Sequence, residues 1–100
     1  MTPKSVKVST DKRYLQINYD QNKTLVLPSF FLRASSPSAE NKKNLEDPKI
    51  DIYQKILIQN VENVGNYAIR IIFSDNHSTG IYSWEFLYKI GIKFQNSLNP

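Results

Sequence analysis

Apolar and polar residues alternate over two short stretches near the start of the chain. Residues 5–9 and 14–19 each place every second side chain on one face, as a half-buried strand does. The polar residues between them suit a tight turn. A second polar turn at 20–23 leads into the aliphatic run 24–27. The pattern predicts three antiparallel strands that form a meander.

The pattern changes at Pro28, where we expect a short helix. Proline suits the first helical position because its φ is preset and its missing N–H is not needed there, and residues 29–33 supply one turn. Residues 34–54 are rich in small, amide and charged side chains. A connection of this length is uncommon in a compact domain, so we predict a loop that is either a binding surface or a floppy linker.

The second half of the chain predicts three more strands. Residues 56–61 are typical of a buried strand, and a turn through Gly65 follows. Alternation is strict over 67–73, so one face of this strand is expected in the core. That face carries Tyr67, Ile69, Ile71 and Phe73. Residues 74–77 are a turn in which asparagine tolerates positive φ, and 78–82 return as a strand.

A short helix is predicted at the end of the chain. Ser83 is a suitable N-cap, and Glu85 complements the positive end of the helix dipole. Lys89 complements the negative end, and Gly91 is expected to stop the helix in a left-handed conformation. We expect Trp84 to anchor this helix in the core.

These elements add up to one α+β domain over residues 1–100. We expect a small antiparallel sheet of about six short strands with two short helices, in two layers. The chain has 100 residues, 40% of them hydrophobic and 22% charged, which is an ordinary globular composition. A domain of this size buries one modest core, so an enzyme with a deep cleft between lobes is not expected.

The inventory of reactive side chains is small. The chain has no cysteine and one histidine, which excludes disulfides, thiolate nucleophiles and cysteine-ligated metal sites within it. The residue types of a Ser-His-Asp triad are present in Ser36 or Ser83, His77 and Asp75, but no nucleophile elbow surrounds either serine. A local hydrogen bond in the 74–77 turn is the simpler role for Asp75 and His77. Arg33 is either a surface residue or a clamp that holds the loop through backbone carbonyls.

The charge distribution and the lack of targeting signals limit the classes of partner that we expect. The net charge is +4, and residues 1–23 hold five basic against two acidic side chains. No face combines clustered basic residues with stacking aromatics, so we expect no nucleic-acid partner. No apolar stretch is long enough to span a membrane, and the N-terminus has no signal-peptide pattern. We therefore expect a soluble, cytoplasmic protein with no membrane partner.

Three blocks of the sequence resemble a known family. They are Phe31-Leu32-Arg33-Ala34-Ser35-Ser36-Pro37-Ser38-Ala39-Glu40, Val64-Gly65-Asn66-Tyr67-Ala68-Ile69-Arg70 and Asp75-Asn76-His77-Ser78-Thr79-Gly80-Ile81-Tyr82-Ser83-Trp84. In order and spacing they are similar to the gamma-butyrobetaine hydroxylase-like N-terminal domains, over about residues 6–91. The chain looks like a stand-alone bacterial member of that family, and the stand-alone members have no established activity.

The resemblance also bears on metal binding. In the hydroxylase branch, the domain precedes an iron- and 2-oxoglutarate-dependent catalytic domain and holds zinc through three cysteines and a histidine. The matching cysteine positions here are Ser36, Ser38 and Asn41, and His77 matches the histidine. Neutral hydroxyl and amide groups do not replace thiolates toward zinc. We therefore expect no cofactor and no metal, with His77 the only retained ligand position.

Three functional hypotheses follow. The first is a non-catalytic accessory module that binds a protein partner. The resemblance links such a module to iron–sulfur cluster assembly or to an iron-dependent oxygenase. Its candidate binding residues are Arg33, Ser36, Ser38, Glu40, Asp75 and His77. The second is a weak iron- or other metal-binding protein that uses His77 with Asp75 and Glu40. The third is a small enzyme that uses Ser36, His77 and Asp75.

Overall fold

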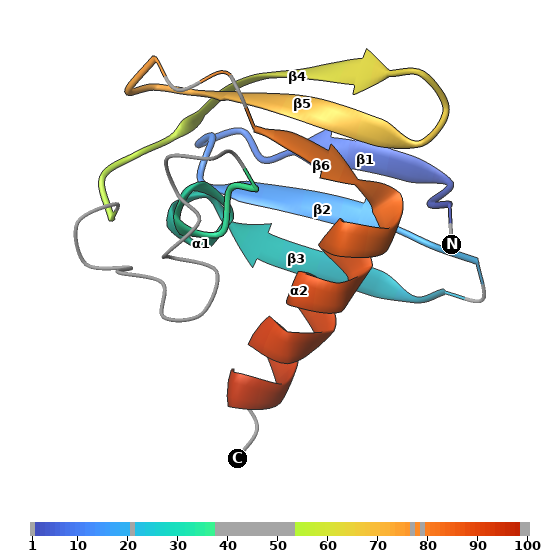
Figure 1. The fold of residues 1–100 in the computed structure, drawn as a ribbon. Helices are drawn as coiled ribbons and strands as arrows, with labels where there is room; N and C mark the ends of the chain where they lie inside the picture. Colours follow the sequence, from blue (N-terminus) through green and yellow to red (C-terminus); the bar gives the residue numbers. More distant parts are fainter. Residues whose placement is uncertain (1, 21, 38–53, 77, 79, 99–100) are drawn as a thin grey trace.

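The fold is described from a computed structural model, which places residues 2–20, 22–37, 54–76, 78 and 80–98 (Figure 1). Within these residues the predicted α+β class, with six strands and two helices, is confirmed. The elements are β1 (Ser5–Val8), β2 (Tyr14–Asn18), β3 (Thr24–Pro28), α1 (Ser29–Ala34), β4 (Ile58–Val64), β5 (Ala68–Phe73), β6 (Ile81–Ser83) and α2 (Trp84–Leu98).

The strands divide into two antiparallel sheets, β1-β2-β3 and β4-β5-β6, rather than forming one. In the first sheet, Leu15 pairs with Val8 on one side and with Leu27 on the other, which places aliphatic side chains on one face. The opposite face is exposed and largely polar, although Tyr14 and Val26 also lie on it, and its Asn18 hydrogen-bonds Gln16 and Ser5. The first sheet therefore has one face for the core and one for solvent.

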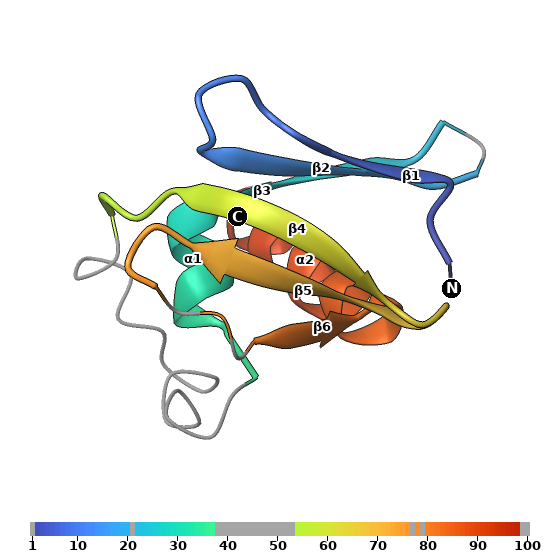
Figure 2. The same cartoon turned by 90° about the horizontal axis from the view of Figure 1, so that it is seen from above.

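The second sheet and both helices cover the same face of the first sheet (Figures 1 and 2). One core fills the space between them, because buried side chains from both sheets form a single cluster. A backbone hydrogen bond of 2.8 Å from Ile58 N to Lys12 O joins the start of β4 to the β1–β2 turn. The fully buried members of the core include Leu15, Ile17, Leu25, Leu27, Leu32, Ile58, Ile71, Phe73, Tyr82 and Leu87.

The C-terminal helix is longer than predicted. Ser83 caps it as expected, because its Oγ accepts a hydrogen bond from Phe86 N at 3.1 Å. The prediction that Gly91 ends the helix is wrong, since α2 continues to Leu98. Gly91 is buried where α2 meets β3, and a Cβ there would lie 2.7 Å from Leu25 Cδ1. The glycine thus permits close packing of the helix on the sheet instead of a left-handed stop.

Other boundaries shift for local reasons. β4 runs to Val64, which pairs with Ala68, so the turn is confined to Gly65 and its neighbours. Tyr67 lies before β5 and is 61% exposed, so its expected place in the core is wrong. The turn prediction at Asn76 is confirmed by its φ of 68°. The predicted 34–54 loop lies mostly outside the described residues.

Candidate functional site

The sequence-predicted site centres on the corner where the end of α1 meets the β5–β6 turn. Arg33, near the end of α1, donates from Nε to Asp75 Oδ2 at 2.9 Å. The arginine side chain is 11% exposed and the aspartate side chain 30%, so this ion pair is mostly shielded from water. A shielded pair is screened less by salt than a surface pair is. Arg33 therefore binds the carboxylate of Asp75, whereas the clamp predicted from the sequence was through backbone carbonyls.

Beneath this corner lies a buried group of hydrogen-bonding residues. Tyr82 is fully buried, and its hydroxyl donates to Leu32 O at 2.5 Å. Burial raises the pKa of Tyr82 above its usual range, while a hydrogen bond with Ser36 acts in the opposite direction. The single hydroxyl proton of Tyr82 goes to Leu32 O, so in its hydrogen bond with Ser36 the tyrosine oxygen accepts and the serine hydroxyl donates. Ser36 and Tyr82 thus tie the residues after α1 to the second sheet.

Gly80 completes this buried group. A Cβ at residue 80 would lie 2.6 Å from Ser36 Oγ and 3.0 Å from Tyr82 Cε1. Real Cβ atoms essentially never approach another atom to 2.6 Å, and 3.0 Å is already a tight contact, so a side chain at residue 80 would displace Ser36 and press on Tyr82. Tyr82 and Gly80 belong to a block that resembles the family, but the sequence predicted no role for either of them. No local pattern marks them, because their partners lie more than forty residues earlier in the chain.

The six predicted site residues have different outcomes. The structure brings Arg33 and Asp75 into direct contact. Ser36 is fully buried beside Tyr82, so its hydroxyl is enclosed within the fold. Ser38, Glu40 and His77 lie outside the described residues.

The zinc that the family resemblance implies does not fit the residue seen here. Of the four positions matched to ligands, the structure describes only Ser36. Its neutral hydroxyl is enclosed by Tyr82 and by the backbone at Gly80, and it donates its proton to a phenol oxygen. Zinc requires deprotonated thiolate, imidazole or carboxylate ligands. Among the described residues, no three His, Cys, Asp or Glu side chains gather closely enough to hold a metal ion.

In the part of the chain that the structure describes, no helix has both the length and the apolar character needed to cross a bilayer.

Comparison with solved structures identifies the fold. A crystal structure from Acidithiobacillus ferrooxidans, a DUF971-family protein with unknown function, is similar with a TM-score of 0.71 and 23% identity, covering 90% of this chain and 92% of that one. Two solution NMR structures are similar with TM-scores of 0.72 and 0.67 and identities of 25% and 27%. Each covers 97% of this chain, and the chain covers 77% and 76% of theirs. No curated protein matches.

A family model gives the assignment itself. The model described as Gamma-butyrobetaine hydroxylase-like, N-terminal matches residues 6–88, which include both sheets apart from Ser5 at the start of β1, and the corner formed by Arg33 and Asp75. The chain therefore belongs to the gamma-butyrobetaine hydroxylase-like N-terminal domain family.

Proposed function

We propose that this domain is a non-catalytic protein-interaction module that acts in the cytoplasm. The observation that supports this function best is the ion pair between Arg33 and Asp75. It joins the end of a helix to a surface residue and is mostly shielded from water, so it fixes Asp75 relative to α1. A surface that is already ordered loses less conformational entropy when a partner binds.

The chemistry of the corner favours binding over catalysis. The Ser36 hydroxyl is used inside the fold, and the Asp75 carboxylate accepts a hydrogen bond from Arg33. A nucleophile must reach its substrate, and a general base must be within hydrogen-bond reach of the proton that it removes. The partner that we propose is a protein that handles iron–sulfur clusters or an iron-dependent oxygenase domain. The family's description, which places such domains N-terminal in hydroxylase-like proteins, supports the second of these partners.

Site-specific photo-crosslinking in the source cells tests this function. A benzophenone amino acid replaces Pro37, which is exposed and follows Ser36. The matched control replaces Lys93, which is exposed on α2. We expect a discrete adduct from residue 37 and none from residue 93. The adduct should weaken when Arg33→Met removes the ion pair, and mass spectrometry should identify an iron–sulfur protein or an oxygenase. The proposal is wrong if residue 37 yields no adduct above the control.

No contact of the described residues favours the alternative of a weak metal site. Such a site needs the carboxylate of Asp75, which Arg33 already engages at 2.9 Å. Metal analysis of the purified chain beside a His77→Ala variant addresses this alternative directly. Metal that is present in the first protein and lost in the second would support it, and equal metal content in both would contradict it.

A further inference from the structure

A groove of about 360 Å³ separates the two sheets along one side of the molecule. Edge strand β1 lies along one wall and edge strand β4 along the other. The groove is lined by Pro3, Lys4, Ser5, Val6, Val8, Val61, Asn63, Ile69 and Trp84. Its volume is within the range of about 300–1,000 Å³ that is common for ligand sites. It lies apart from the corner at Arg33, none of whose residues line it.

The wall formed by β1 carries backbone groups that can pair with another strand. Ser9 N donates to Tyr14 O, so Ser9 and Tyr14 form a hydrogen-bonded pair. Such pairs recur at every second residue, so the next one joins Lys7 of β1 to Gln16 of β2. Antiparallel strands direct the N–H and C=O groups of alternate residues to opposite sides. Those of Val6 and Val8 therefore point away from β2, toward the free edge. An unpaired edge of this kind is a template for an added strand.

The floor of the groove is largely apolar. Val6 and Val8 are half-buried on the core face of β1, and Val61 is half-buried across from them. Trp84 closes one part of the groove, and its ring is held because Nε1 donates to Asn66 O at 3.0 Å. A strand added to β1 would place every second side chain on this floor. Aliphatic, β-branched side chains suit those positions.

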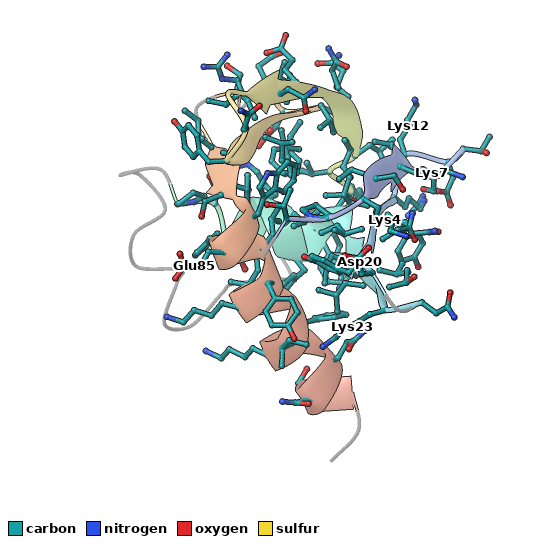
Figure 3. All side chains as sticks on the ribbon, turned by 90° about the vertical axis from the view of Figure 1, so that its right-hand side faces the viewer. Lys4, Lys7, Lys12, Asp20, Lys23 and Glu85 are labelled. Atoms are coloured by element: carbon teal, nitrogen blue, oxygen red, sulfur yellow. The ribbon has the colours of Figure 1, made fainter. Side chains whose placement is uncertain are left out.

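The other face of an added strand would meet positive charge. Lys7 projects to the solvent face of β1, and Lys4 and Lys12 flank the strand on the same side of the molecule (Figure 3). Asp20 lies near these lysines, and its Oδ1 forms an ion pair with Lys4 Nζ at 3.3 Å. Carboxylates next to lysines across a strand pair are favourable, whereas like charges are not. A second copy of this chain, pairing β1 with β1, would bring lysines together.

We propose that the β1–β4 groove binds an extended segment of a partner protein in which acidic and aliphatic residues alternate. The segment adds to the free edge of β1, with its aliphatic side chains on the groove floor and its carboxylates beside Lys4 and Lys7. This inference rests on the proposed interaction function and names the chemistry of a partner. It assigns that partner to a surface different from the corner at Arg33.

A designed peptide tests the groove directly. The probe is acetyl-Glu-Val-Glu-Val-Glu-Val-Glu-amide, which has no aromatic residue. Trp84 is the only tryptophan of the chain and lines the groove, so its fluorescence reports binding without a label. We expect a saturable change in this fluorescence, together with amide chemical-shift changes at Val6, Val8 and Asn63 in ¹⁵N NMR spectra.

Three controls separate strand addition from general attraction. A peptide with lysine in place of each glutamate should not bind. N-methylation at every valine removes one set of N–H donors, and N-methylation at every glutamate removes the other, so at least one of these peptides should lose binding. Lys4→Glu with Lys7→Glu should weaken binding by at least about tenfold, because like charges then face each other. Lys89→Glu with Lys93→Glu on α2 changes the net charge equally and should alter affinity less than twofold.

The contrary results are equally definite. No change in Trp84 fluorescence or in the amide shifts at millimolar peptide overturns the proposal, as does binding that survives both kinds of N-methylation. Equal binding of an oligothymidylate, or dimers of the free chain that exclude the peptide, would assign the groove to another occupant and likewise overturn it. If the peptide fails while residue 37 still cross-links a partner, the interaction function stands and the groove assignment falls. Loss of the cross-link alone contradicts the function proposed for the corner.

Discussion

At the residue scale, Gly91 shows how one small side chain sets the approach of α2 to the first sheet. Alanine there gains about 1 kcal/mol in helix propensity over glycine. Its Cβ, however, would lie 2.7 Å from Leu25 Cδ1, and Leu25 is fully buried. Overpacking of this kind costs about 1–3 kcal/mol. We expect Gly91→Ala to lower the free energy of unfolding by about 1 kcal/mol, measured by urea denaturation.

The reason for this loss can be separated from a general effect of the substitution. In a Leu25→Val background the clashing methyl group is gone, so Gly91→Ala should change sign and stabilise the protein by up to about 1 kcal/mol. Lys89→Ala, on the exposed face of α2, should have almost no effect. If Gly91→Ala destabilises both backgrounds equally, contact with Leu25 is not the cause.

A second residue, Tyr19, links stability to alkaline pH. The residue is only 5% exposed, and its hydroxyl has no hydrogen-bond partner among the described residues. Burial, and to a lesser extent the neighbouring Tyr88, raises the pKa of Tyr19 to about 12. Unfolded tyrosine releases its proton near pH 10. The unfolded state therefore holds fewer protons between these two values, and stability falls as pH rises from about 10 to 12.

Tyr19→Phe should remove this part of the pH dependence. Near pH 7 the variant should be as stable as the parent chain or more stable by up to about 1 kcal/mol, because an unpaired buried hydroxyl is gone. Between pH 10 and 11 its unfolding free energy should fall less steeply than that of the parent. Urea denaturation across this range gives both slopes, and parallel slopes would show that Tyr19 titrates alike in the folded and unfolded chains.

At the scale of elements, the ion pair between Arg33 and Asp75 connects α1 to the β5–β6 turn. Removal of one partner leaves the other charge poorly solvated, because the arginine side chain is only 11% exposed. We expect Arg33→Met and Asp75→Asn each to destabilise the protein, and a double-mutant cycle to give a coupling energy of about 1–2 kcal/mol. The exposed pair between Arg70 and Glu62, at 3.4 Å, is the control. Its coupling should stay below about 0.5 kcal/mol.

The two cycles should also respond differently to salt. Raising sodium chloride from 0.1 to 1 M shortens the screening length from about 10 Å to about 3 Å, which mainly affects exposed pairs. The coupling between Arg33 and Asp75 should therefore persist. A coupling that disappears in salt, or that is no larger than the control, would mean that the pair does not hold Asp75 against α1.

The elements themselves could be predicted from the sequence wherever periodicity was strong. Strict alternation marked β2 and β5, and the cap at Ser83 marked the start of α2. The end of α2 could not be predicted, because glycine serves equally as a helix stop and as a point of close packing. Only the position of Leu25 across the interface distinguishes these two uses.

At the scale of the whole molecule, the candidate site was predicted in part. Arg33 and Asp75 were both singled out, but their pairing spans 42 residues and depends on how the second sheet sits against α1. The enclosure of Ser36 by Tyr82 and the groove between β1 and β4 depend on the same arrangement. Alternation within a strand says which face is buried and does not say that six strands divide into two sheets. Contacts between the two sheets could therefore not be predicted from the pattern of apolar and polar residues.

The shared core predicts that the two sheets unfold together. Ile17 of the first sheet and Ile71 of the second belong to one cluster of buried side chains, so neither sheet keeps its apolar face covered without the other. Trp84 fluorescence reports the β1–β4 groove, and far-ultraviolet circular dichroism reports all elements. The two signals should give the same urea midpoint. Ile17→Val and Ile71→Val should each lower the unfolding free energy by about 0.5–1.5 kcal/mol and move both signals equally. Separate midpoints, or a shift in one signal only, would show that the sheets are independent folding units.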